Sequence, residues 1–375
     1  MSRTFGIDAR AAVEVPAGRG RYVRELLRHL AKLPGDDRWV LFARKRWEEQ
    51  SLDDRFSWRL HDLPDPAWHL AAGLGAAGCD AFLSTNSYLT SWVCRSPCAV
   101  VVYDMIAFRP EYEPQRRAAV IERATIRLGL RRASALLAIS QATRDDLVDL
   151  YPATAAKTVV VPLAADRRFS PERRPSDDAV LHGLGVRFPY VLSTGTLEPR
   201  KNLVRLIEAF ASLSPVDRMG HRLVVAGPEG WEVQPILDRA KSHAGVVLTL
   251  GRVSEEQLEV LYRRAGVLAY PSLYEGFGLP VLEAMQSGAP VLTSDRSSLP
   301  EVAGDCAVYV DPSEIRQISA ALRRLLTDHP QRARMAALGL ARAQQFDWAV
   351  TARATRDILA QISDSPAPGS DRTPI

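Results

Sequence analysis

The sequence predicts an α/β protein with two doubly wound domains, each built on a parallel sheet, whose strand-end loops face each other across a cleft. Short apolar runs rich in β-branched residues alternate with longer helical patterns along the whole chain, as in sheets that helices cover on both faces. About twelve such runs occur, which is too many for one doubly wound sheet. The 375 residues also exceed one typical domain.

The predicted strands fall into two sets. The N-terminal set consists of residues 4–8, 39–43, 81–85, 98–104, 135–140 and 158–163. The C-terminal set consists of residues 190–195, 222–227, 246–251, 266–272, 289–294 and 306–311. Because open parallel sheets bind ligands at the carboxyl ends of their strands, we expect the functional residues directly after these runs.

The segment 164–189 separates the two sets of strands. It contains three prolines and lacks a long periodic pattern, so we expect the interdomain linker there. The predicted domains therefore span residues 1–170 and 171–345. The last stretch, 363–375, is rich in Ser, Pro, Gly and Asp and is predicted to be disordered, because it cannot form a core.

Composition limits the possible classes of function. The chain has a net charge of +4 and 7% aromatic residues. Proteins that bind nucleic acid usually have far more positive charge, interleaved with aromatic residues, so the composition argues against that class. Four cysteines are too few for a disulfide scaffold, and none has zinc-site spacing. No stretch reaches the roughly 18 apolar residues of a membrane span, and the start lacks the apolar core of a signal peptide. We therefore expect a cytoplasmic protein.

The strongest local motif is the stretch 270–285, YPSLYEGFGLPVLEAM. A strand end leads into a turn at Gly276, Phe277 and Gly278, and Pro280 suits the first turn of a helix. Such a loop presents backbone N–H groups at a helix N-terminus, where a phosphate or sugar oxygen binds favourably. The alternative interpretation is an ordinary strand-to-helix turn.

Two glutamates accompany this turn. Glu275 precedes it, and Glu283 lies eight residues later, one turn into the predicted helix. Both carboxylates can therefore face one ligand from different distances. The alternative is a capping glutamate and a solvated one.

A second motif, VLSTGTLEPRKNLVRLIEAF, covers residues 191–210. A predicted strand ends near Gly195 and Thr196, and Arg200 and Lys201 lie just before an amphipathic helix. Two cations at such a junction suit a diphosphate, because Arg binds phosphate through two parallel hydrogen bonds and Lys acts as a point charge. The alternative is an exposed basic pair on a loop.

Two weaker features lie in the N-terminal half. Gly18 and Gly20 follow the first predicted strand, but Val23 stands where a dinucleotide-binding fingerprint has its third glycine, so we expect no nicotinamide cofactor. This glycine loop is predicted either to contact a diphosphate or an acceptor or to be a plain loop at the start of a helix. Tyr103 and Asp104 follow an apolar strand and are predicted to contact a sugar or an acceptor, although a helix cap explains Asp104 equally well.

Several other chemistries have no motif in this sequence. It contains no GxxxxGK[ST] phosphate loop, no HExxH, no GxSxG nucleophile elbow and no kinase catalytic loop. It also contains no Asp-x-Asp triplet, and its seven histidines are scattered. We therefore expect no bound metal ion.

The chain resembles a known family, the retaining family 4 glycosyltransferases. The resemblance rests on TGTLEPRKNL, AGPEGW, LGRVSEEQLEVLYRRA, the stretch 271–312 and FDW at 346–348. The N-terminal half is similar only in outline, through GRGRY, YDM and AISQATRDDL. The resemblance implies the GT-B fold: two Rossmann-like domains, of which the first binds the acceptor and the second the nucleotide-sugar, with the helix at about 346–362 returning to the first domain.

The resemblance also implies roles for individual residues. Glu275 is similar in position to a glutamate that contacts the donor sugar, Glu283 to one that contacts the ribose, and Arg200 and Lys201 to a diphosphate clamp. Glu275, Arg200 and Lys201 are therefore the expected catalytic residues. The other expected donor-binding residues are Gly195, Thr196, Gly276, Phe277, Gly278 and Leu279. The family transfers its sugar with retention of configuration and needs neither a metal nor a resident cofactor.

One position departs from the family pattern. Many relatives carry a histidine immediately before the aspartate of the N-terminal motif, and this chain has Tyr103 there. We therefore expect Tyr103 to contact sugar or acceptor and assign it no catalytic role.

The donor and the acceptor are inferred from the same resemblance. TLEPRKN, GPEGW and SLYEGFGLP are similar to members that use GDP-mannose, and less so to those that use dTDP-rhamnose or UDP-sugars. Such relatives commonly extend a lipid-diphosphate-linked glycan for surface polysaccharide. The segment 116–132 has six arginines and one acidic residue, so it either contacts an anionic membrane or is an ordinary amphipathic helix.

Two rival functions remain. A nucleotide-sugar epimerase of similar two-domain form would need an acid–base pair and no acceptor. A catalytically inactive sugar-nucleotide-binding subunit would keep the fold without turnover.

Overall fold

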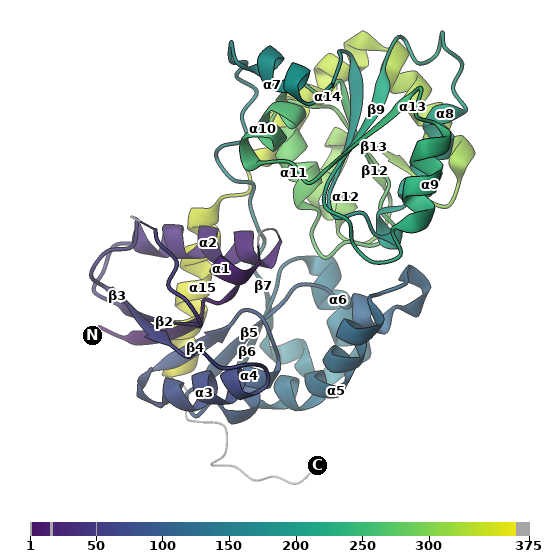
Figure 1. Cartoon of the computed structure of the whole chain (residues 1–375). Coiled ribbons are helices and arrows are strands. Elements are labelled where there is room, and N and C mark those ends of the chain that lie inside the picture. The colour runs from purple at the N-terminus through teal and green to yellow at the C-terminus, as the bar shows by residue number, and fades with distance from the viewer. Residues whose placement is uncertain (1, 16–17, 50, 365–375) are drawn as a thin grey trace. The chain divides into compact units, whose positions relative to one another are not determined.

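The computed structural model describes residues 2–15, 18–49 and 51–364. It divides the chain into two compact units (Figure 1). Unit 1 comprises Met1–Phe108, Arg116–Leu163 and Asp347–Ile375, and unit 2 comprises Arg109–Gln115 and Ala164–Phe346. Residues 365–375, most of the tail predicted to be disordered, lie outside the described part of the chain.

Unit 1 has a parallel sheet with the order β3-β2-β1-β4-β5-β6-β7. Its strands are β1 (Thr4–Asp8), β2 (Arg38–Ala43), β3 (Phe56–Leu60), β4 (Ala81–Ser84), β5 (Cys98–Val102), β6 (Ala135–Ala138) and β7 (Thr158–Val160). Its helices are α1 (Ala11–Glu14), α2 (Arg19–Ala31), α3 (Ala67–Gly75), α4 (Leu89–Val93), α5 (Arg116–Arg132), α6 (Gln141–Leu150) and α15 (Trp348–Ser363).

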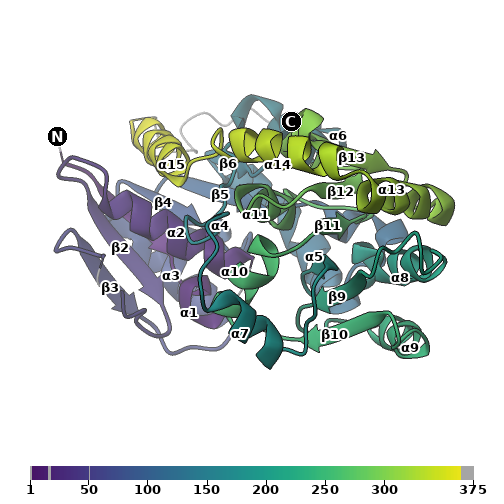
Figure 2. The same cartoon turned by 90° about the horizontal axis from the view of Figure 1, so that it is seen from above.

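Helices cover both faces of the unit 1 sheet. Alternate strand residues such as Phe82, Val100 and Leu136 pack with Trp68 of α3 and Ile126 of α5 in one core. The helices α2 and α15 lie side by side on the opposite face (Figures 1 and 2). The nearly continuous apolar strands of the sequence follow from this double cover.

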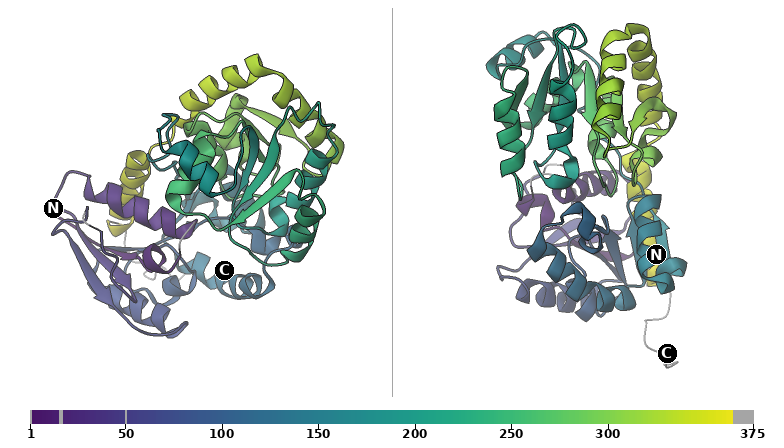
Figure 3. Two further views of the ribbon diagram at one scale, coloured as in Figure 1. Left: turned by 45° about the horizontal axis from the view of Figure 1, so that its top comes forward. Right: turned by 90° about the vertical axis from the view of Figure 1, so that its right-hand side faces the viewer.

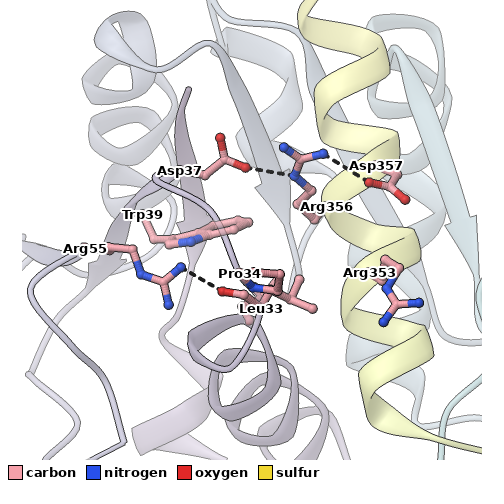
Figure 4. Close-up of a pocket in the computed structure, with 9 residues that line it drawn as sticks. Leu33, Pro34, Asp37, Trp39, Arg55, Arg353, Arg356 and Asp357 are labelled. Atoms are coloured by element: carbon pink, nitrogen blue, oxygen red, sulfur yellow. Dashed lines mark hydrogen bonds and ion pairs between the residues drawn. The ribbon is translucent and has the colours of Figure 1, made fainter. Parts of the chain in front are cut away.

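The helix α15 is fixed to unit 1 at both ends. Trp348 is buried at its start, and the Thr351 hydroxyl donates to the Pro162 carbonyl at 2.7 Å. Further along, Arg356 donates through Nε to Asp37 at 2.8 Å, beside a cavity of about 270 Å³ between α15, the end of α2 and the start of β2 (Figure 4). Residues far apart in sequence therefore build one unit.

Unit 2 has a second parallel sheet, with the order β10-β9-β8-β11-β12-β13. Its strands are β8 (Tyr190–Thr194), β9 (Arg222–Ala226), β10 (Val247–Gly251), β11 (Val267–Tyr270), β12 (Val291–Ser294) and β13 (Ala307–Val310). Its helices, which flank the sheet on both faces (Figure 3), are α7 (Asp177–Gly183), α8 (Leu203–Ala211), α9 (Gln234–Ser242), α10 (Glu255–Arg263), α11 (Leu279–Gln286), α12 (Leu299–Ala303), α13 (Ile315–Thr327) and α14 (His329–Ala343).

The α/β prediction with two parallel sheets is confirmed, but two elements were missed. The strand β3 lies at the edge of its sheet and is half-exposed, so its sequence FSWRL lacks a continuous apolar run. The helix α7 lies in the segment 164–189, where no helix was predicted. Asp177 of α7 accepts hydrogen bonds from Arg263 at 3.1 Å, and neither side chain is exposed. This buried ion pair ties α7 to α10, a contact that local sequence does not reveal.

The two strand orders define one special place in each sheet. The order reverses between β1 and β4 in unit 1 and between β8 and β11 in unit 2. Ligands of open α/β sheets bind at the carboxyl ends of the strands at such a reversal. Among the described helices, none is both long and apolar enough to cross a bilayer.

Candidate functional site

The unit 2 site lies where the strand order reverses. Gly195 and Thr196 follow β8, and the loop Ser272–Glu275 follows β11. A short 3-10 turn, Pro199–Lys201, presents Arg200 and Lys201. The backbone N–H of Leu273 donates to the Arg200 carbonyl at 2.7 Å, so the two loops are joined.

Glu275 is the centre of this site and is only 6% exposed. Arg200 donates through Nη1 to its Oε2 at 2.7 Å, and Lys201 donates through Nζ to its Oε1 at 2.6 Å. The hydroxyls of Tyr270 and Ser272 donate to the same Oε1 at 2.7 and 2.6 Å. The carboxylate is therefore held in one orientation.

The electrostatics of this cluster follow from burial and from two cations. Burial by itself raises the pKa of Glu275, but Arg200, Lys201 and the hydrogen bonds outweigh it and lower that pKa to about 2. Burial and the charge of Arg200 lower the pKa of Lys201, while Glu275 opposes that shift. Glu275 is therefore ionised at neutral pH and has no proton to donate.

Sequence reasoning missed three residues of this cluster. Glu198 forms an ion pair with Nε of Arg200, so the guanidinium lies between two carboxylates. Tyr270 and Ser272 complete the ring around Glu275. A signal was present, because Glu198 directly precedes the basic pair and the other two occupy the end of a predicted strand.

The glycine turn after Glu275 shapes the start of α11. Gly278 has φ 105°, and a Cβ there would lie 2.8 Å from Cδ2 of Leu299. The Ser298 hydroxyl donates to the carbonyls of Glu275 and Phe277, at 2.8 Å each. Gly276 and Phe277 are buried in this turn, and Leu279 begins the helix.

Glu283 lies within α11 and is 2% exposed. The structure therefore places both predicted glutamates in buried positions on one loop-and-helix segment. Gly195 has φ 116°, and a Cβ there would lie 3.5 Å from Cε of Lys201. The residues predicted to bind the donor thus surround the end of β8 and the start of α11.

The residues predicted to contact the acceptor lie in unit 1. Gly18 precedes the first turn of α2 with φ 52°. A Cβ on Gly20 would lie 1.7 Å from the Val15 carbonyl oxygen, so tight packing explains this glycine without any ligand. Tyr103 and Asp104 follow β5 directly, and Asp104 accepts a hydrogen bond from the Ile106 N–H at 3.0 Å.

The described residues contain no group of three or more His, Cys, Asp or Glu side chains placed to hold a metal ion. At the strand ends of unit 2, the positive charge of the described site comes from Arg200 and Lys201.

Two family models match the chain. The model described as Glycosyltransferase Family 4 covers residues 16–169, and the model described as Glycosyl transferases group 1 covers residues 182–340. Among curated proteins, the O-antigen chain mannosyltransferase B of Escherichia coli is 34% identical over 299 residues, which span 78% of this chain and 74% of that protein. The serotype-specific mannosyltransferase WbdA of Escherichia coli is 31% identical over 59% of this chain, but that match spans only 28% of the longer WbdA.

Solved structures share the fold. HepE of Anabaena, in complex with UDP and glucose, superimposes with a TM-score of 0.76 over 96% of this chain and 100% of HepE, at 20% identity. WaaG, a glycosyltransferase involved in lipopolysaccharide biosynthesis, superimposes with a TM-score of 0.71 over 95% of this chain and 99% of WaaG, at 19% identity. The chain therefore belongs to the family 4 glycosyltransferases, has mannosyltransferase relatives and adopts the GT-B fold.

Proposed function

We propose that this transferase moves mannose from GDP-mannose to a glycan acceptor, with retention of configuration and without a metal ion. We further propose that the acceptor is a lipid-diphosphate-linked glycan of surface polysaccharide biosynthesis. The observation that carries the proposal is the buried Glu275–Arg200–Lys201 cluster at the carboxyl edge of the unit 2 sheet. The choice of mannose is supported by the names of the two Escherichia coli relatives.

The chemistry suits the charges of the cluster. In the transfer, the acceptor oxygen bonds to the anomeric carbon, the bond from that carbon to the diphosphate breaks, and the acceptor proton passes to the diphosphate. Negative charge therefore grows on the leaving group, where Arg200 and Lys201 stabilise it. Because Glu275 is ionised, we assign it hydrogen bonds from sugar hydroxyls and stabilisation of positive character on the sugar, not proton transfer.

The first test is thermal stabilisation of the purified protein by GDP-, UDP-, dTDP- and ADP-sugars, with and without EDTA. A ligand that binds only the folded state raises the melting temperature. We expect a shift with GDP-mannose that EDTA does not change and that Arg200→Ala reduces. A shift with UDP-sugars alone would indicate that the donor is a UDP-sugar and not GDP-mannose; the structure of HepE in complex with UDP and glucose motivates this alternative. A shift with a dTDP-sugar would indicate a rhamnosyltransferase.

Turnover separates the enzyme from its rivals. Transfer of radiolabelled mannose to an organic-extractable lipid fraction supports the proposal. Binding of a nucleotide-sugar without transfer or hydrolysis would favour the inactive binding subunit. Isomerisation of the free nucleotide-sugar would indicate an epimerase.

We also propose that α5 holds the protein at the inner face of an anionic membrane. Val120 is 64% exposed and Ile121 50% exposed on this helix. The arginines exposed beside them are Arg116, Arg117, Arg123, Arg127, Arg131 and Arg132. Apolar residues flanked by arginines favour binding in the interface of anionic lipid.

Sedimentation with vesicles tests this part of the proposal. We expect binding to phosphatidylglycerol vesicles, weak binding to phosphatidylcholine vesicles, and loss of binding at high salt because salt screens the attraction. The variant Arg117→Glu/Arg127→Glu should lose binding, whereas Arg316→Glu/Arg323→Glu on α13 is the matched control. Equal binding of both variants would contradict the proposal.

A further inference from the structure

Unit 1 carries a second cluster of charged and hydroxyl side chains at the carboxyl edge of its sheet. Asp104 and Tyr103 follow β5, Arg19 begins α2, Tyr88 precedes α4, and Glu122 lies in α5. The helices α2 and α5 cover opposite faces of this sheet (Figure 1). Residues at the carboxyl ends of the strands lie between the two helices. Glu122 was not singled out by any sequence motif.

The side chains of this cluster act on one another. The Arg19 guanidinium lies over the Tyr103 ring, 5.1 Å from its centroid. Tyr88 is 8% exposed, and burial raises the pKa of its hydroxyl. The charges of Glu122 and Asp104 raise that pKa as well, while Arg19 lowers it. Burial and, to a lesser extent, the charge of Asp104 raise the pKa of Glu122 to about 7, while Arg19 opposes the shift.

Three buried polar atoms at the ends of β1 and β5 make no hydrogen bond to any described residue: the Tyr103 hydroxyl, Oδ2 of Asp8 and Nε of Arg10. The Arg10 nitrogen lies 3.6 Å from Oδ1 of Asp8, so its charge is compensated within the chain. Asp8 ends β1 and is 0% exposed. Burial raises the pKa of the Tyr103 hydroxyl, and the charge of Asp8 contributes to that rise. Thr85, which follows β4, donates to the Asp8 carbonyl at 2.6 Å, so Asp8 lies at the reversal of strand order, and Tyr103 follows the next strand, β5. Buried polar atoms are nearly always hydrogen-bonded, so the Tyr103 hydroxyl and Oδ2 of Asp8 are available to bind a polar ligand.

We propose that Arg19, Tyr88, Tyr103, Asp104 and Glu122 form a subsite for the neutral hydroxyls of the sugar acceptor, in which Glu122 determines specificity. This inference rests on the proposed transferase function and names the groups that select its acceptor. Two carboxyl groups accept hydrogen bonds from neighbouring sugar hydroxyls, while Arg19 donates to a sugar oxygen. Because the acidic pair outweighs the single arginine, the subsite repels a phosphorylated or carboxylated sugar ring.

The pH dependence of this subsite has a definite sign. The ionised Glu122 accepts a charge-assisted hydrogen bond from a hydroxyl of the sugar acceptor. Protonation as the pH falls through about 7 removes the charge and turns one carboxyl oxygen into a donor, which weakens that bond. The charged and titratable groups facing it are Asp104 after β5, Arg19 of α2 and Tyr88 before α4. The acceptor KM is therefore expected to rise as pH falls from 8 to 6, by up to about tenfold for one titrating group.

The test compares Glu122→Gln and Glu122→Ala with Glu48→Gln, which makes the same chemical change at an exposed glutamate of unit 1. The probes are methyl α-D-mannopyranoside and its 6-phosphate, measured by saturation-transfer NMR and as competitors of transfer. We expect Glu122→Gln to raise the acceptor KM about tenfold or more, since a hydrogen bond to a charged group is lost. We expect a kcat within twofold of the original, an acceptor KM without its pH dependence, and weakened discrimination against the phosphorylated probe.

Donor stabilisation by GDP-mannose, measured on the same variants, keeps the two proposals apart. If GDP-mannose does not stabilise the wild-type protein, the proposed function itself is rejected. Normal donor binding with an unchanged acceptor KM in both Glu122 variants would overturn the subsite while leaving the transferase intact. Tighter binding of the phosphorylated probe than of the neutral one would overturn it equally. Retained melting temperatures in Glu122→Gln exclude simple unfolding.

Discussion

The two units place carboxylates at equivalent edges of their sheets and hold them in opposite ways. In unit 2, Glu275 is surrounded by cations and hydroxyls that lower its pKa to about 2. In unit 1, burial outweighs the nearby arginines and raises the pKa of Asp8 to about 6 and that of Glu122 to about 7. Burial acts in the same direction in all three cases, so the difference comes from the number and closeness of the cations.

This difference separates two kinds of binding site. A carboxylate fixed by Arg200 and Lys201 stays charged at every physiological pH and is preorganised before a ligand arrives. A carboxyl group that has few partners and a pKa near 7 changes its charge around neutral pH, and it has oxygen atoms left to accept hydrogen bonds from ligand hydroxyls. We infer that unit 2 is built to stabilise charge, whereas unit 1 is built to recognise uncharged groups.

We expect the largest effect from a substitution in the Glu275–Arg200–Lys201 cluster of unit 2. Glu275→Gln removes the negative charge while keeping the shape of the side chain, and we expect a loss in kcat of about 10²–10³-fold, as for a preorganised electrostatic group. GDP should bind at least as tightly as before, because a negative charge that opposes the diphosphate is gone. Steady-state transfer and thermal stabilisation by GDP measure the two effects.

The matched control for this variant is Glu256→Gln, an exposed glutamate of α10. It should leave transfer unchanged. A Glu275→Gln variant with full activity would reject the assigned role of the carboxylate.

A second prediction concerns the guanidinium. Arg200 is 20% exposed at its side chain, whereas Lys201 is 8% exposed, so Arg200 is the more accessible cation of the pair. Arg200→Ala should weaken GDP-mannose binding by about 30-fold, the effect of losing a charge-assisted hydrogen bond. Isothermal titration with GDP-mannose measures this, and an affinity within threefold of the original would contradict it.

A third prediction tests the raised pKa in unit 1. The pKa of Asp8 is higher in the folded state than its ordinary value of 3.8, so its contribution favours folding below that value and is lost as pH rises through about 6. Asp8→Asn should therefore gain stability relative to the original protein between pH 4 and pH 7, by about 2 kcal/mol. Urea unfolding at both pH values, with exposed Asp62→Asn as control, measures the difference.

A fall in the relative stability of Asp8→Asn over that pH range would show that Asp8 is held as an ion, as Glu275 is. The contrast between the units would then rest on Glu122 alone.

The smallest expected effect is the absence of a change on metal removal. If the cations of the chain neutralise the diphosphate, EDTA should leave kcat within about 20% of its value, well below the tenfold change that 1.4 kcal/mol produces. Activity lost in EDTA and restored by Mg²⁺ or Mn²⁺ would mean that Arg200 and Lys201 are insufficient. Transfer assays with and without added metal decide this.

Local patterns in the sequence were sufficient to predict much of the fold. Continuous apolar runs separated by helices predicted two parallel sheets, because strands buried on both faces require such runs. The glycine turn at Gly276 and Gly278 and the basic pair Arg200 and Lys201 had local signals, since turns, caps and phosphate sites use particular residue types at fixed spacing. The half-exposed strand β3 had no such signal and was missed.

Which side chains meet, and which of them are charged, depends on contacts between segments that are distant in the sequence. Glu275 and Lys201 are 74 residues apart, and their hydrogen bond exists because β8 and β11 are neighbours in the sheet. Glu122 reads as one acid within a basic helix, yet burial beside Asp104 changes its protonation. A pKa depends on desolvation and on charges from distant segments, and local sequence specifies neither of them.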